Sequence, residues 1–120
     1  SQSVKAPIAS LELSNGARAG LTGAVAVIAR KAARHNVTIN ALLPGPFDTD
    51  RLKGSTKKMA EMKGISAEEM ARHRKAEVPA GRFGHPDEFG AAAAFLCSAH
   101  AGFITGQNLL MDGGIYPGTM

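Results

Sequence analysis

The stretch that decides the fold is NVTINALLPGPFDTDRL, residues 36–52. Its first half is apolar and rich in β-branched residues, which predicts a buried strand from Val37 to Leu43. Pro44-Gly45-Pro46 then ends the strand in a turn. Asn36 tolerates the left-handed backbone that ends a helix, so we expect a helix to run directly into this strand. A helix followed at once by an apolar strand is half of a β-α-β unit.

Upstream of this strand, residues 14–35 show the periodicity of an amphipathic helix. Serine is a preferred residue at the start of a helix, so Ser14 is expected to cap it. Basic residues crowd the last turn, where they complement the negative end of the helix dipole. The apolar residues recur three and four positions apart, at Leu21, Ala24, Val25, Ile28 and Ala32.

Downstream, residues 50–80 form a charged segment with a helical pattern, which we call the flap. Gly54 and Gly64 interrupt the pattern and predict a short helix at 56–62 before a second one that Ser66 caps. An interrupted, charged helix pair next to a turn is suited to closing over a ligand.

The last third of the chain predicts another helix and another strand. Proline suits the first helical position, so a helix is expected from Pro86 to Ala99. Gly102 is expected to take the left-handed conformation that follows a helix end. A second buried strand is expected from Gln107 to Asp112.

This order of elements indicates an α/β fold in which the two strands are parallel. A ribbon of two parallel strands leaves both edges and both faces uncovered, and such a ribbon is not expected to be stable alone in water. We therefore expect residues 1–120 to be one partial domain, the second part of a larger sheet.

The composition is that of a soluble globular chain, with 44% apolar and 20% charged residues. No apolar run approaches the roughly 20 residues that cross a bilayer, and residues 1–10 lack signal-peptide character, so no membrane role is expected. The single cysteine, Cys97, is expected to be buried and inert in a reducing cytoplasm. The four histidines lack the spacing of metal ligands, so no metal site is expected.

The net charge of +4 comes from one segment. Residues 51–82 hold nine Lys or Arg against four Glu, whereas the rest of the chain is slightly acidic. The segment has no interleaved aromatic residues and no nucleic-acid motif, so we expect no nucleic-acid partner.

Five short motifs follow one another along the chain in a specific order. They are an Asn four residues before Pro-Gly, then Pro-Gly-x-x-x-Thr, Gly-Arg-Phe-Gly-x-Pro-x-Glu, Ile-Thr-Gly-Gln and Asp-Gly-Gly, and they lie within residues 36–52 and 79–114. Each alone is a weak turn signal. Together they make the chain resemble the C-terminal half of the short-chain dehydrogenase/reductase family, and particularly its 3-oxoacyl-[acyl-carrier-protein] reductases.

The resemblance implies a Rossmann-type doubly wound parallel sheet that binds NAD or NADP at the carboxyl ends of its strands. It places the turn Pro44, Gly45, Phe47 and Thr49 beside the nicotinamide, with the threonine bonding the carboxamide. A bare Pro-Gly turn is the alternative. The family's glycine-rich phosphate loop is not in this sequence, so we expect tight cofactor binding to need a missing N-terminal half.

The catalytic residues that the resemblance implies are altered here. Counting back without gaps from Pro44, the family's lysine, tyrosine and serine fall on Arg18, Ser14 and Ser1, or on Ser3 if the alignment slips by two. In the family the tyrosine protonates the carbonyl oxygen as hydride arrives, and the lysine lowers its pKa and holds the ribose.

These substitutions change the chemistry. The hydroxyl of Ser14 is a much weaker acid than a phenol and is shorter by a ring. Arg18 keeps a positive charge that can hold ribose hydroxyls, but a guanidinium does not relay a proton. The alternatives are a helix cap for Ser14 and an exposed helical arginine for Arg18.

The resemblance thus predicts an NAD(P)-dependent reductase acting on a small-molecule carbonyl or acyl thioester. The basic flap is expected either to attract phosphopantetheine or an acidic carrier, or to be a solvated face. The alternative is a catalytically silent member that works through cofactor binding or assembly. Family members resembling this chain are dimers or tetramers paired through the helix at 17–34 and the last strand and helix. A third possibility is that the acid comes from residues outside this chain.

Overall fold

The computed structural model describes residues 1–9 and 11–119, and it has the α/β character that the sequence predicts. Two short 3-10 turns are η1 (Gln2–Val4) and η2 (Ala99–Ala101). The longer elements are α1 (Glu12–Ala33), β1 (Ala41–Pro44), α2 (Asp50–Lys63), α3 (Ala67–Ala76), α4 (Pro86–Leu96) and β2 (Asn108–Met111).

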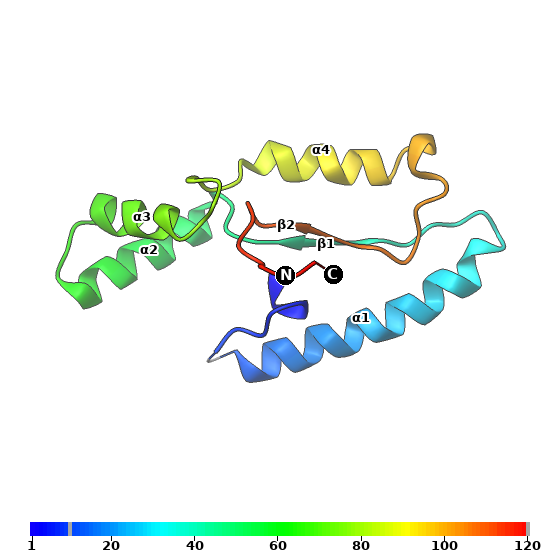
Figure 1. Ribbon diagram of the computed structural model, residues 1–120, viewed down its shortest axis with the longest axis horizontal. Helices are drawn as coiled ribbons and strands as arrows, with labels where there is room; N and C mark the ends of the chain where they lie inside the picture. Colours follow the sequence, from blue (N-terminus) through cyan, green and yellow to red (C-terminus); the bar gives the residue numbers. More distant parts are fainter. Residues whose placement is uncertain (10, 120) are drawn as a thin grey trace.

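The two strands pair in parallel, as the sequence predicts. The register runs from Ala41 opposite Asn108 to Pro44 opposite Met111. Figure 1 shows α1 and α4 on opposite sides of this ribbon, and the α2–α3 pair beyond the carboxyl ends of the strands. The molecule is elongated, with extents of 56 × 29 × 26 Å.

At the start of both strands, side-chain hydrogen bonds take the place of further backbone pairing between the strands. Asn40 donates from Nδ2 to the Ile104 carbonyl at 2.8 Å and accepts at Oδ1 from the Gln107 amide at 3.0 Å. The Ile39 amide donates to Thr105 Oγ1 at 3.1 Å. The motif asparagine and the Ile-Thr-Gly-Gln motif therefore bind each other at the start of both strands.

The predicted first strand is partly wrong at its beginning. It was expected from Val37 to Leu43, but β1 begins at Ala41, because the residues before it bond to the 104–107 loop instead of to a neighbouring strand. Asn36 has φ of 58°, which confirms the left-handed turn between helix and strand.

The start of α1 corrects a second expectation. The helix begins at Glu12, and its first position is preceded by Leu11, which provides no side-chain cap. Ser14 therefore lies inside the first turn and is not the cap. Most of α1 is exposed, and Ala29 is its buried residue, 3.9 Å from where a Cβ on Gly106 would lie.

The flap folds as a helix pair, with one boundary different from the prediction. Thr49 caps α2, which begins at Asp50 and runs through Gly54 without interruption. Gly64, with φ of 67°, ends it, and the Ser66 side chain caps α3 by accepting from the Glu69 amide. The sequence thus placed the break between the helices correctly and the first start too late.

The end of α4 gives two further corrections. The helix stops at Leu96 rather than at Ala99, and Cys97 at its end is exposed rather than buried. Gly102 has φ of −61°, so it is right-handed and not the left-handed residue expected. Within residues 1–9 and 11–119, no helix combines the length and apolarity of a membrane span.

Candidate functional site

A cavity of about 460 Å³ lies at the carboxyl end of β1. We call it the β1 cavity. Its walls come from the N-terminal segment, the turn after β1, the start of α2, the end of α3 and two later loops, through Ser1, Gln2, Ile8, Pro44, Gly45, Pro46, Arg51, Leu52, Arg74, Glu77, Val78, Phe83 and Ile115. Parallel α/β sheets bind ligands at this edge.

The turn after β1 is packed tightly against the end of β2. The Gly45 amide donates to the Met111 carbonyl at 2.9 Å. A Cβ added at Gly45 would lie 2.7 Å from both Cα and Cβ of Asp112 and 3.0 Å from Gln2 Oε1. Only glycine allows this approach without a shift of backbone, so the Pro-Gly motif shapes the wall of the cavity.

The second half of the turn is tied to the loop that precedes α4. The Asp48 amide donates to the Gly84 carbonyl at 2.8 Å, and the Gly84 amide donates to the Pro46 carbonyl at 3.0 Å. Phe47 packs edge to face on Phe89 of α4, with ring centroids 5.6 Å apart. The turn is therefore fixed in place before any ligand binds.

Thr49, at the end of the turn, serves the helix that follows. Its Oγ1 accepts from the Leu52 amide at 3.3 Å. The hydroxyl proton is not used in that bond, so it can still be donated to a ligand.

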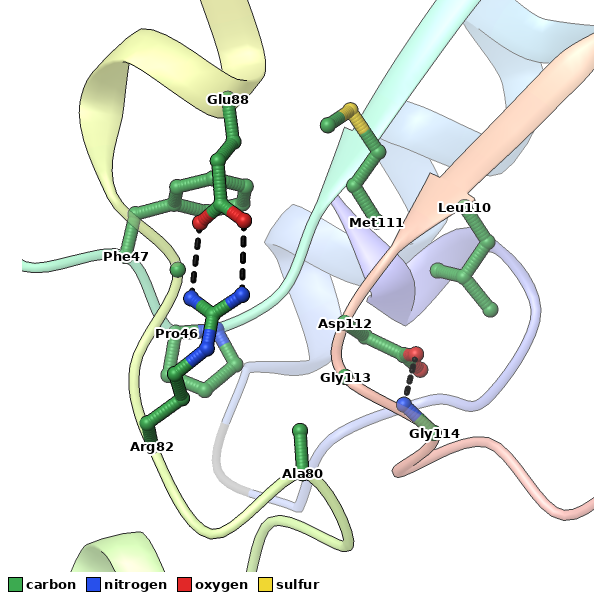
Figure 2. Close-up of a pocket in the computed structure, with 11 residues that line it drawn as sticks. Pro46, Phe47, Ala80, Arg82, Glu88, Leu110, Met111, Asp112, Gly113 and Gly114 are labelled. Carbon is green, nitrogen blue, oxygen red and sulfur yellow. Dashed lines mark hydrogen bonds and ion pairs between the residues drawn. The ribbon is translucent and has the colours of Figure 1, made fainter.

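A second cavity, of about 330 Å³, lies on the other side of the same turn (Figure 2). Arg82 and Glu88 form a bidentate pair in its wall, at 2.7 and 2.8 Å. These bonds, with a further one from the His85 amide, lower the pKa of Glu88 to about 2. Asp112 is buried and accepts from the Gly114 and Tyr116 amides, each at 2.9 Å. These charged groups already have partners, so we interpret this cavity as structural.

The three residues expected at the catalytic positions are only partly brought together. Ser1 lines the β1 cavity beside Pro44 and Gly45. Its Oγ lies 3.1 Å from the hydroxyl of the buried Ser3.

Ser14 and Arg18 lie one turn apart near the start of α1, which packs on η1. Ser14 is half-buried and Arg18 is exposed. Neither side chain lines the β1 cavity. The structure therefore places neither Ser14 nor Arg18 on the wall of the β1 cavity, although the helix that carries them packs on η1, next to Ser1.

Four polar lining residues were not expected from the sequence: Gln2, Arg51, Arg74 and Glu77. Gln2 Oε1 is buried and has no hydrogen-bond partner among residues 1–9 and 11–119. None of the four belongs to a recognised motif, and they meet only because the α2–α3 pair and the N-terminal segment converge on β1. In the described part of the chain, no group of three His, Cys, Asp or Glu is placed to hold a metal.

Comparisons with known proteins agree over most of the chain. A family model described as enoyl-(acyl carrier protein) reductase matches residues 1–116. The 3-oxoacyl-[acyl-carrier-protein] reductase FabG of Vibrio cholerae is 38% identical over 83% of this chain. The NADPH-dependent reductase BacG of Bacillus subtilis is 34% identical over 92%. The chain spans 36% and 42% of the lengths of these two relatives.

Solved structures give the same result for the fold. The crystal structure of YwfH, an NADPH-dependent reductase involved in bacilysin biosynthesis, superposes with a TM-score of 0.88 and 31% identity. It covers 97% of this chain and is itself covered to 44%. The parallel strands and their flanking helices are thus the same arrangement as in that reductase.

Proposed function

Because this chain belongs to the short-chain dehydrogenase/reductase family, we propose that it provides the substrate-side half of an NAD- or NADP-dependent reductase that converts a carbonyl to an alcohol. The observation that carries the proposal is the family match over residues 1–116. The position of Pro44, Gly45 and Pro46 on the wall of the β1 cavity supports it, whereas Phe47 and Thr49 do not line that cavity.

The residues at the β1 cavity fit the nicotinamide end of such a cofactor. The orphaned acceptor of Gln2 can receive a hydrogen bond from a carboxamide N–H. Thr49 does not line the cavity, but it lies three residues beyond the lining residue Pro46, and its free hydroxyl proton can be donated to a carboxamide oxygen. When bound, the cofactor supplies the hydride.

The chain's own residues would then orient the substrate. Ser1 has a hydroxyl on the cavity wall and can donate a hydrogen bond to the carbonyl oxygen. Arg18, on the helix that packs on η1, carries a fixed positive charge and can hold ribose hydroxyls. Ser14 lies outside the cavity and is a weak acid, so the proton for the alcohol oxygen comes from another group.

A second function is favoured by the same substitutions. A chain with serine and arginine in place of the family's tyrosine and lysine would be catalytically silent, acting through cofactor binding or assembly as a dimer or tetramer. Large apolar side chains exposed on α1 support the assembly role, among them Leu13, Leu21, Val27 and Ile28.

The experiment that separates these functions restores the family pair. NADH or NADPH oxidation would be measured with an acetoacetyl thioester, using the polypeptide that carries this sequence and its Ser14→Tyr/Arg18→Lys variant. General acid catalysis contributes roughly 10²- to 10⁴-fold, which is the gain expected if the native site is silent. Arg30→Lys, at the far end of α1, is the matched control.

The outcomes differ clearly. Turnover by the native protein at a rate that the double variant does not exceed supports an active reductase with a different proton donor. Turnover only after restoration supports the silent protein. Absence of turnover in both, together with no binding of either dinucleotide, contradicts both functions.

A further inference from the structure

Two arginines from different helices line the β1 cavity, and the reductase proposal uses neither. Arg51 lies in the first turn of α2, and Arg74 lies near the end of α3. They share this cavity with Ser1 and Pro44, the residues proposed to face the carbonyl and the nicotinamide.

The guanidinium of Arg74 is held in one orientation by uncharged oxygens. Its Nη1 donates to Thr56 Oγ1 at 2.6 Å and to Ser55 Oγ at 3.0 Å, and the Leu52 carbonyl lies 3.5 Å away. All three acceptors are neutral, so they fix the group without cancelling its charge. The half-buried side chain makes no ion pair within the described residues.

The rest of that guanidinium is still available. No hydrogen bond from Nε or Nη2 is found in the described structure, and neither atom is among its buried unpartnered groups. A planar fork with free donors matches a carboxylate or phosphate, which accept two parallel hydrogen bonds.

Arg51 adds a second positive charge to the same wall. It is exposed, precedes Leu52 directly, and has no ion pair in the part of the chain described. Its place in the first turn of α2 adds the positive end of a helix dipole. Of the nearby carboxylates, Asp48 is paired with Lys53 at 3.6 Å, Asp50 precedes Arg51 in the first turn of α2 without lining the cavity, and Glu77 is the one that lines the cavity. Two guanidinium groups therefore face one carboxylate.

We propose that Arg51 and Arg74 bind an anionic group on the substrate, so that the preferred substrate is a small carbonyl compound carrying a carboxylate or a phosphate. That the bound molecule is a substrate rests on the proposed reductase function, but the anion site itself does not depend on that function. A cavity of about 460 Å³ accommodates a compact molecule whose carbonyl lies at Ser1 and whose anion lies at the arginines.

The anion site is tested first, without cofactor. Inorganic phosphate and acetate are titrated by calorimetry into the native protein and into Arg51→Gln, Arg74→Gln and Arg74→Lys, at constant ionic strength set with chloride. Loss of a charge-assisted hydrogen bond predicts affinity weaker by roughly 10- to 100-fold in both glutamine variants. Arg72→Gln, an exposed arginine on α3 that does not line the cavity, is the matched control and should bind like the native protein.

Arg51→Gln decides the test if Arg74→Gln fails to fold, because Arg51 is exposed and bonds to nothing whose loss would unfold the chain. Unchanged affinity in a folded Arg51→Gln protein, or absence of anion binding by the native protein, overturns the proposal. Equal weakening by Arg72→Gln also overturns it, because the effect would then be general surface charge.

The substrate arm compares matched pairs: acetoacetate with acetone, and dihydroxyacetone phosphate with dihydroxyacetone. In the pair that the protein reduces, Arg51→Gln should raise the KM for the anionic ketone roughly 10-fold and leave the KM for the neutral ketone unchanged. The pair that responds identifies carboxylate or phosphate as the anion. Anion binding without turnover of any ketone would support the anion site and contradict the reductase function. Turnover with the same KM for the anionic and the neutral ketone would support the reductase function and contradict the anion site.

Discussion

The two ends of the parallel strands and the first turns of α1 contrast sharply. At the strand ends, motif residues bond to one another: Asn40 to the 104–107 loop, Gly84 to the turn after β1, and Asp112 to the amides that follow it. At the start of α1, the side chains of Ser14 and Arg18 make no hydrogen bond in the described residues. The residues that carry the family resemblance are those that hold the fold.

This contrast separates two kinds of evidence. Similarity over the strand-end motifs establishes the fold, because those residues are constrained by packing. The positions where the resemblance implies catalytic residues, Ser14 and Arg18, lie on a mostly exposed helix, where substitution costs little stability. Family membership and catalytic activity must therefore be tested by different variants.

The strongest test of the constrained region is Gly45→Ala. The new methyl group would lie 2.7 Å from Asp112, so strand ends or turn must move, and destabilisation at the upper end of about 1–3 kcal/mol is expected. Chemical unfolding measures it. Gly54→Ala, in open space within α2, should instead stabilise by about 0.5–1 kcal/mol. Equal stability of the two variants would break the comparison.

A somewhat smaller loss is expected for Asn40→Ala. It removes two hydrogen bonds and leaves the Ile104 carbonyl and the Gln107 amide without their partner, which costs about 1–2 kcal/mol by chemical unfolding. Asn40→Asp keeps the acceptor for the Gln107 amide but sets a carboxylate oxygen against the Ile104 carbonyl, so it should destabilise at least as much as the alanine variant. An unfolding midpoint for Asn40→Ala equal to that of the native protein would show that the two Asn40 hydrogen bonds are dispensable.

Two serines give a matched comparison of smaller size. Ser66→Ala removes the cap of α3 and should destabilise by about 1 kcal/mol. Ser14→Ala removes no cap, because α1 begins at Glu12, and should be neutral or slightly stabilising. Thermal unfolding distinguishes them. A loss at Ser14 as large as that at Ser66 would restore the capping role that the structure removes.

The smallest effect concerns pH. The pKa of Glu88 is lowered from 4.5 to about 2, so its ion pair with Arg82 stabilises the fold at and above pH 4.5 and this contribution is lost as pH falls toward 2. Glu88→Gln should flatten the fall in melting temperature over that window. Glu61→Gln, at an exposed α2 glutamate, is the control. An identical pH profile for Glu88→Gln and the native protein would contradict the assignment.

The sequence predicted what local chemistry determines. The left-handed turn at Asn36, the cap at Ser66 and the parallel pairing of two apolar strands follow from residue type and spacing. The predicted start of α2 is too late because the helix that Thr49 caps continues through Gly54. Cys97 was expected inside because alanines surround it, yet it lies past the end of α4.

The site was predictable only where it belongs to a motif. Of the residues that the resemblance implies, Ser1, Pro44 and Gly45 line one cavity, whereas Phe47 and Thr49 do not line it. Arg51 and Arg74 could not be foreseen there, because their approach depends on how the α2–α3 pair closes on itself through Thr56. Helix-pair geometry of this kind is not encoded in residue spacing.

Pro46 lines both cavities and so is the partition between them. Proline has no backbone N–H to donate, and the carbonyl of Pro46 already accepts from Gly84. The backbone of Pro46 therefore has no N–H to donate to a ligand in either cavity, and its carbonyl is already bonded to Gly84. A ligand that contacts Pro46 is selected there by its shape. Polar groups that distinguish one ligand from another must lie on the opposite walls of the cavities.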